Sequence, residues 1–92
     1  MKQGADKEKD YLYKAIVAVS SVDECRDFFD DVCTIKEITS IAQRLTVARL
    51  LKEGKTFNEI VEETGASSAT ISRVNKCLVY GNGYKHVLEK LD

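Results

Sequence analysis

The stretch TFNEIVEETGASSATISRV, residues 56–74, decides the fold of this chain. It predicts a short helix over 57–64 and, after a glycine, a second helix over about 68–80. Gly65 permits a tight turn between the two helices, because glycine has no Cβ to hinder a positive φ angle. Ser67 carries the hydroxyl that suits the cap of the second helix. The stretch is therefore interpreted as a helix-turn-helix.

Apolar side chains in this stretch are spaced so that the two helices pack against each other. The residues expected to face inward are Ile60, Val61, Thr64, Ile71 and Val74. With these groups turned inward, the outer surface of the second helix carries small polar and cationic side chains. That outer surface comprises Ser67, Ser68, Ala69, Thr70, Ser72, Arg73 and Lys76.

A helix with hydroxyl side chains and an arginine on its outer surface suits the major groove of DNA. Ala69 can contact the methyl group of thymine, and Arg73 or Lys76 can reach guanine or the DNA backbone. Lys55 and Thr56 lie at the start of the preceding helix, where the helix dipole attracts phosphate. We therefore predict that the chain binds double-stranded DNA through its second helix.

Two other interpretations of the stretch stay open. The serines and threonines can simply cap and solvate an exposed helix, and helix-turn-helix units also occur as protein-protein interaction modules of the transcription machinery. The overall acidity favours a protein-binding module. The predicted outer surface disfavours it, because interface hot spots use exposed aromatic or large aliphatic anchors, and none is expected there.

Helix caps and glycines divide the rest of the chain. The capping-box pattern S/T-x-x-E, which satisfies free N–H groups at a helix start, begins at Ser21, Thr34 and Thr56. Glycine marks helix ends at Gly54 and in the Gly81-Asn82-Gly83 break. The remaining helices are expected at about 7–20, 22–32, 35–53 and 84–91, with residues 1–6 disordered. The chain is thus predicted to be all-α, with about six helices in a single domain over residues 1–92.

Apolar residues at helical spacing in these other helices are candidates for the core. They are Leu12, Ile16, Val19, Ile38, Ile41, Ala42, Leu45, Ala48, Leu51, Leu78, Val87, Leu88 and Leu91. A chain of 92 residues buries a smaller fraction of its surface than a larger domain does. Its size therefore favours a homodimer.

Composition and charge exclude several classes of protein. Hydrophobic residues make up 43% and charged residues 32% of the chain, which is typical of a globular protein rather than a disordered one. The longest apolar run, residues 15–19, is far too short to span a membrane, and no signal peptide opens the chain. We therefore expect a cytoplasmic protein. Its net charge of −1 disfavours unspecific polyanion binding, although residues 66–92 carry four basic and two acidic side chains.

Residues that could support catalysis or bind a metal are few and scattered. His86 is the sole histidine, and no nucleophile and base stand at the spacing of a catalytic site. Cys25, Cys33 and Cys77 have no CxxC spacing, so reduced and mostly buried thiols are expected. The acidic residues within 24–31 lack a calcium-binding loop and indicate a solvated helix face. We therefore expect no enzymatic activity, no metal and no cofactor.

Several segments of the chain resemble one known family. GASSATISR, followed by a helix, the YGNG break and a terminal helix, resembles the Trp repressor superfamily. More narrowly, FFDDVCTIKEI, AQRL, VARLLKEGKTF, GASSATISRV and CLVYGNGY together resemble its YerC/YecD subgroup. The likeness covers roughly residues 10–90, and this spread of segments is more specific than the helix-turn-helix alone.

The resemblance implies a fold and a function. Helices within 7–53 would interlock with those of a partner in an intertwined homodimer, 54–80 would hold the helix-turn-helix, and 81–92 the C-terminal helix. The two helix-turn-helix units of the dimer, here called its reading heads, would face successive major grooves of DNA. The resemblance implies a bacterial transcription regulator, which we expect to be a repressor. The family's DNA contacts would fall on Ser68, Ala69, Thr70, Ser72 and Arg73.

The resemblance does not extend to the tryptophan pocket of the family, which uses an arginine, a glycine and a serine on the recognition helix. Arg73 matches the arginine, but Val74 replaces the glycine and Cys77 the serine. A valine side chain would project where the indole must lie, so tryptophan binding is not expected. A second pocket arginine falls near Gln43 and Arg44. Another small-molecule effector, or none, stays open.

Overall fold

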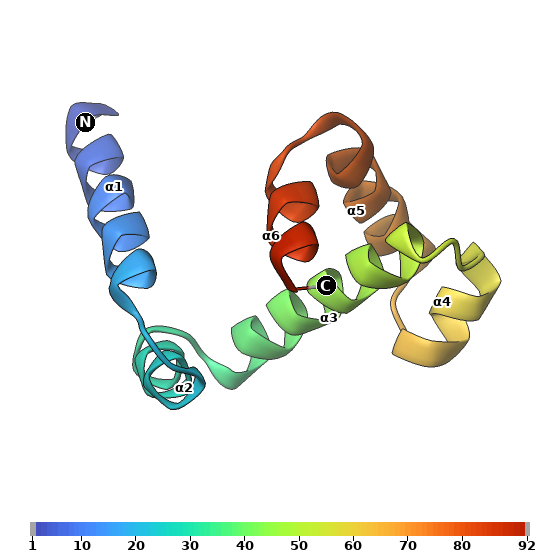
Figure 1. Cartoon of the computed structure of the whole chain (residues 1–92), viewed down its shortest axis with the longest axis horizontal. Helices are drawn as coiled ribbons and strands as arrows, with labels where there is room; N and C mark the ends of the chain where they lie inside the picture. Colours follow the sequence, from blue (N-terminus) through green and yellow to red (C-terminus); the bar gives the residue numbers. More distant parts are fainter. Residues whose placement is uncertain (1, 92) are drawn as a thin grey trace. The chain divides into compact units, whose positions relative to one another are not determined.

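The computed structural model describes residues 2–91, with side chains described for residues 4–91, and all regular structure in that range is helical. The six helices are α1 (Lys2–Ala18), α2 (Val22–Val32), α3 (Ile35–Lys52), α4 (Phe57–Thr64), α5 (Ser68–Tyr80) and α6 (Gly83–Leu91) (Figure 1). The all-α prediction with about six helices is confirmed. The chain divides into two compact units, one ending at Ile35 and the other beginning at Lys36.

The first helix differs from its predicted bounds. We expected a helix over 7–20 after disordered residues, but α1 already includes residues 2–6 and ends at Ala18. No proline interrupts the start of the chain, and a single glycine costs a helix only about 1 kcal/mol. The helical pattern therefore continues toward the N-terminus. Met1 lies outside the described residues.

The first unit, α1 with α2, buries none of its own described side chains. Leu12 and Ile16 were expected in the core, but 39% and 38% of their surfaces are exposed. Tyr11 and Val17, at 78% and 83%, are even more exposed. The predicted burial of Leu12 and Ile16 is therefore wrong for the unit by itself, because two helices provide no second layer to cover their apolar faces.

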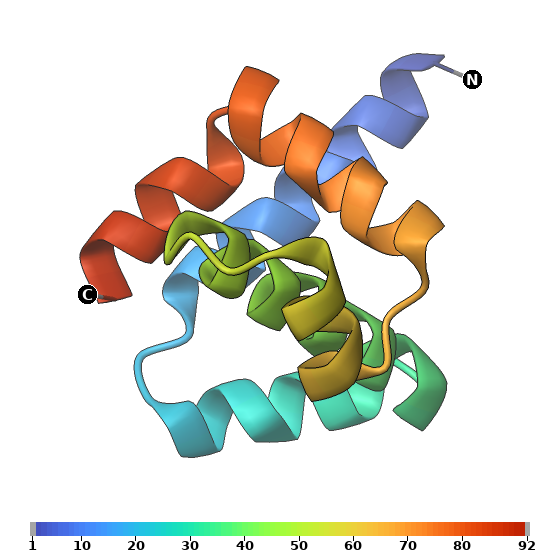
Figure 2. The same ribbon diagram turned by 90° about the vertical axis from the view of Figure 1, so that its right-hand side faces the viewer.

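The second unit packs α3 to α6 around one apolar core. Its buried members are Val47, Ala48, Leu50, Ile60, Ala66, Ile71, Val74 and Leu88, with Leu51, Leu78 and Tyr84 packed against them. Helix α5 contacts both α4 and α6 (Figure 2). Burial of Ala48, Ile60, Ile71, Val74 and Leu88 was predicted and is confirmed.

Other core candidates in this unit were predicted wrongly. Those exposed in the chain by itself are Ile41, Ala42, Leu45, Val61, Val87 and Leu91, and Ile38 is half-buried. The buried part of α3 lies at its C-terminal end, where Val47 and Leu50 meet the helices that follow. Its N-terminal half is covered only in part by the rest of the unit.

Local hydrogen bonds define the helix ends largely as predicted. Thr56 begins α4 with a complete capping box, in which its hydroxyl accepts from Glu59 N at 3.2 Å and Glu59 Oε2 accepts from Thr56 N at 3.0 Å. Ser21 caps α2 by accepting from Glu24 N at 3.0 Å, whereas the Glu24 carboxylate accepts from the Ser20 hydroxyl at 3.3 Å. No helix in the described residues is long and apolar enough to cross a membrane.

The break between α5 and α6 depends on the absence of a side chain at one position. Gly81 donates its N–H to Cys77 O at 2.8 Å, and the chain then passes close to the last turn of α5. A Cβ built on Gly81 would lie 2.7 Å from that carbonyl oxygen, whereas a Cβ on Gly83 would meet nothing within 4 Å. Gly81 is therefore required for close approach, and Gly83 is not.

Replacing Gly81 with alanine is expected to destabilise the fold. The methyl group forces the end of α5 to shift, and overpacking of this kind costs about 1–3 kcal/mol of unfolding free energy. Gly83→Ala is the matched control and should not lower stability, because its methyl group has room. Urea unfolding of both variants measures the difference. Equal stability of the two variants would contradict this account of the break.

Candidate nucleic-acid interface

The turn of the helix-turn-helix is held from inside by the last residue of α4. The Thr64 hydroxyl donates to Ile60 O at 2.7 Å and accepts from Ala66 N at 3.1 Å. Gly65 adopts a left-handed conformation with a φ of 71°, as predicted, and Ala66 is buried in the core. The chain therefore enters α5 along a defined path.

Ser67 caps α5 and orients Thr70. Its Oγ accepts from Thr70 N at 3.1 Å, which confirms the predicted cap, and its hydroxyl donates to Thr70 Oγ1 at 3.1 Å. Thr70 is half-buried beside this contact. Because both hydrogen-bonding roles of the Ser67 hydroxyl are used, Ser67 supports the start of the helix while Thr70 keeps a hydroxyl proton to donate.

Burial separates α5 into two faces. Ile71 and Val74 are 0% and 1% exposed, so they anchor the helix to the core. On the opposite side, the exposed predicted residues are Ser68, Ala69, Ser72, Arg73 and Lys76. Neither Arg73 nor Lys76 forms an ion pair within residues 4–91. The exposed face therefore presents short side chains together with two unpaired positive charges.

Two further residues belong to this face and were not predicted there. Val79 and Tyr80, at 50% and 82% exposed, follow Lys76 at spacings of three and four residues. The expectation that the outer surface lacks a large aliphatic or aromatic side chain is therefore wrong at the C-terminal end of α5. The signal was present in the helical spacing, which continues from Ser72 through Lys76 to Tyr80.

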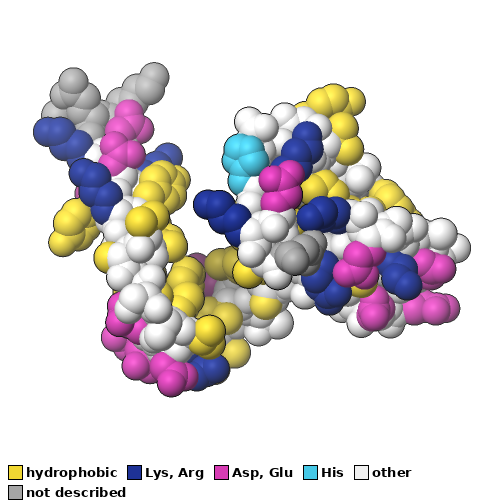
Figure 3. Space-filling view, viewed as in Figure 1, with side chains coloured by type: hydrophobic (Ala, Val, Ile, Leu, Met, Phe, Trp, Pro, Cys, Tyr) yellow, Lys and Arg dark blue, Asp and Glu magenta, His cyan; other side chains and the backbone are white. Residues whose placement is uncertain are grey.

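The start of α4 has acidic rather than basic surroundings. Lys55 lines a shallow hollow with Glu59, Glu62 and Glu63, and acidic side chains gather over α4 (Figure 3). Thr56 is exposed, but its side chain and its N–H are both used in the capping box. Phosphate contacts by Lys55 and Thr56 thus stay a prediction, and the neighbouring carboxylates oppose them.

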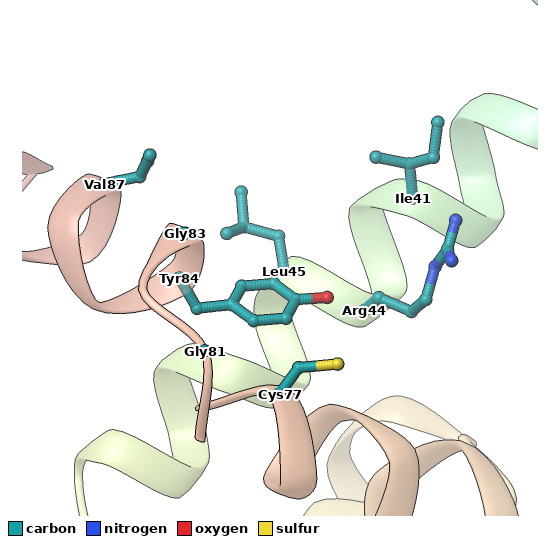
Figure 4. A pocket seen from close by; sticks show the side chains of 8 residues that line it. All are labelled: Ile41, Arg44, Leu45, Cys77, Gly81, Gly83, Tyr84 and Val87. Carbon is teal, nitrogen blue, oxygen red and sulfur yellow. The ribbon is translucent and has the colours of Figure 1, made fainter. Parts of the chain in front are cut away.

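An apolar groove of about 480 Å³ opens between α3 and the α5–α6 break. Its lining consists of Ile41, Arg44, Leu45, Cys77, Gly81, Gly83, Tyr84 and Val87 (Figure 4). Val74 lies in the core and does not line this groove, so the groove does not test the prediction about tryptophan. Arg73 is also absent from the lining. Arg44 and Cys77 therefore line the same groove, whereas Arg73 lies outside it.

The described residues contain no assembled metal site. No group of three or more His, Cys, Asp or Glu side chains within residues 4–91 could hold a metal ion. Cys25 and Cys33 are half-buried and Cys77 is exposed, and all three are free thiols. The expectation of mostly buried thiols is therefore wrong for Cys77, because its position on α5 faces the open groove.

The sequence and the fold are similar to those of several known proteins. Residues 7–92 match the family model described as Trp repressor protein. The chain is 55% identical over 86 residues to the uncharacterized protein YerC of Bacillus subtilis (strain 168), covering 92% of this chain and 83% of that relative. The resemblance to the Trp repressor superfamily and to YerC is therefore confirmed.

Two solved structures share the fold. A TrpR-like protein from Eubacterium eligens ATCC 27750 is 51% identical with a TM-score of 0.88, over 92% of this chain and 89% of that chain. A candidate Trp repressor from Staphylococcus aureus is 44% identical, also with a TM-score of 0.88, over 92% of this chain and 86% of that chain. The helical architecture is thus that of TrpR-like proteins.

Removing the Ser67 hydroxyl is expected to weaken the start of α5. Ser67→Ala should lower the free energy of unfolding by about 1 kcal/mol, which is typical for loss of an N-cap side chain. Ser68→Ala, one residue along on the exposed surface, should leave stability nearly unchanged. Thermal unfolding of both variants checks the difference. If both variants unfold at the wild-type temperature, the Ser67 cap contributes nothing to stability.

Proposed function

Because this chain belongs to the Trp repressor family, a family of DNA-binding regulators rather than enzymes, we propose that it is a sequence-specific repressor that reads the major groove of DNA with α5. One observation carries the proposal. The apolar residues of α5 are buried in the core, and its opposite face exposes small polar side chains with Arg73 and Lys76.

Each part of the exposed face has a proposed role. Ser68, Ala69 and Ser72 are short, so the helix can approach the base edges closely. Thr70, oriented by Ser67, donates a hydrogen bond to a base edge or a phosphate. Arg73 contacts guanine or the backbone, and a bidentate contact with guanine contributes about 1–3 kcal/mol of discrimination.

Lys76 lies one turn beyond Ser72 and is proposed to contact phosphate. A protein bound in the major groove of DNA would then block the access of the transcription machinery to that DNA. A DNA-binding role also supports our expectation of a cytoplasmic protein.

A homodimer is proposed as the active form. Large apolar side chains gather in the C-terminal half of α1, where Tyr11, Tyr13 and Val17 are 78%, 56% and 83% exposed. Nothing within the first unit buries them. The apolar groove of the second unit also exposes Ile41, Leu45 and Val87. A second copy that covers these surfaces would place two reading heads about a two-fold axis, which requires a two-fold symmetric operator.

Binding to a protein of the transcription machinery is the second candidate function. The exposed Val79 and Tyr80 favour it, because such side chains serve as interface anchors. The acidic surface of α4 also suits a basic protein better than DNA. Enrichment of a duplex DNA whose affinity falls steeply with salt favours the DNA-binding function, because phosphate contacts release counterions. The groove at Cys77 could hold a small-molecule effector, and tryptophan is not the expected ligand.

Selection from random duplex DNA tests the proposed repressor. The protein should enrich a two-fold symmetric site, and the affinity for that site should fall at least about tenfold between 50 and 200 mM salt. Arg73→Ala removes one contact from each subunit and should lower the affinity for the selected site by about 30-fold or more, equivalent to at least about 2 kcal/mol, without a change in unfolding temperature. Fluorescence anisotropy with the labelled duplex measures both effects.

Lys90→Ala is the matched control for Arg73→Ala. It removes one exposed positive charge from α6 and should lower affinity far less than Arg73→Ala does. Equal losses in the two variants would mean that Arg73 acts only through net charge. If the folded dimer enriches no duplex, the protein-binding function takes precedence.

The proposed dimer is tested by a charge on α1. Val17→Asp alters a side chain that is 83% exposed in the single chain, so it should not disturb the chain's own packing. In a dimer that buries Val17, the unpaired carboxylate should raise the dissociation constant by about 100-fold or more. Lys14→Asp adds the same group to the same helix as a control. Sedimentation measures both, and a Val17→Asp variant that stays as dimeric as the wild-type protein would exclude Val17 from the interface.

A further inference from the structure

A polar contact joins the long helix α3 directly to the helix-turn-helix. Gln43 Nε2, on α3, donates a hydrogen bond to Thr64 O at 3.2 Å, across 21 residues of sequence. Both residues are half-buried. Thr64 is the last residue of α4 and precedes the left-handed Gly65. The contact therefore holds α3 to the point where the chain turns toward α5.

Apolar contacts also join α3 to the helix-turn-helix. Val47, Ala48 and Leu50 pack in the same core as Ile60 and Ile71. Burial of apolar surface stabilises this packing but is non-directional, so it permits small changes of angle. A hydrogen bond weakens when its geometry is distorted. The Gln43–Thr64 hydrogen bond is thus suited to define the orientation of α3 relative to the helix-turn-helix. The apolar core stabilises this packing without fixing its angle.

Further hydrogen bonds connect Thr64 to the first turn of α5. The Thr64 hydroxyl accepts from Ala66 N, and the next residue, Ser67, bonds to the N–H and the hydroxyl of Thr70. A sequence of short polar contacts therefore leads from Gln43 to the first turn of α5. A change of orientation at Thr64 would be transmitted to the reading surface.

We propose that Gln43 is a positioning residue that sets the angle of α5 against α3 and thereby the distance between the two reading heads of the dimer. This inference rests on the proposed function, in which α5 reads DNA and two copies act together. The 13 residues of α5 span about 20 Å. A tilt of about 10° therefore displaces one end of the helix by roughly one base-pair step. Gln43 itself contacts no DNA.

Binding to duplexes that differ only in the spacing between two half-sites tests this role. The half-site is taken from the selected operator, and a duplex with one half-site is measured in parallel. Wild-type protein should prefer one spacing by at least tenfold over spacings changed by one base pair. Gln43→Met, which has no donor, should retain single half-site affinity within about twofold and lower the spacing preference to threefold or less.

Two further variants separate hydrogen bonding from shape. Gln43→Glu keeps the length of the side chain but cannot donate as a carboxylate, so it should lose the spacing preference as Gln43→Met does. Gln43→Lys retains a donor and should keep the preference. Because the readout is a ratio between spacings, a general loss of folded protein does not change it.

The outcomes distinguish this inference from the proposed function. If Gln43→Met or Gln43→Glu keeps the wild-type spacing preference, Gln43 does not set the distance between the heads. Equal loss on the single half-site and on every spacing also overturns the inference, because Gln43 would then only support the fold. If the wild-type dimer binds none of the duplexes, the proposed function itself is wrong.

Discussion

Burial of Ile71 and Val74 on one side of α5 is the interaction on which the rest of this structure depends. A fully buried aliphatic side chain stabilises a fold by about 1.5–3 kcal/mol, and these two residues pack in one core with residues of α3, α4 and α6. Because one face of α5 is held inward, the opposite face must be exposed. The proposed reading surface is therefore a direct consequence of the core.

The two units of the chain differ in how they obtain stability. Residues from Lys36 onward have their own core, whereas α1 and α2 bury none of their described side chains. In the proposed homodimer the second copy supplies the missing layer. Folding of the first unit and placement of the two reading heads would then be one event. The apparent stability of such a protein depends on its concentration.

The charge distribution is consistent with selective rather than general binding of DNA. The net charge is −1, and α4 carries Glu59, Glu62 and Glu63 beside the recognition helix. Arg73 and Lys76 therefore provide local attraction against an acidic background. Such an arrangement weakens non-specific binding, which depends mainly on phosphate contacts. Affinity would then come from contacts that a particular operator allows, and from the spacing between its half-sites.

The amino-acid sequence by itself determined the features that depend on neighbours within four residues. The caps at Thr56 and Ser67 and the turn at Gly65 were predictable because their hydrogen bonds and backbone angles are local. Tertiary structure alone decided that Ile41 and Leu45 stay exposed in the single chain and that Gln43 reaches Thr64. Helical spacing shows which residues share a face, but only the packing of distant segments decides which part of that face is covered.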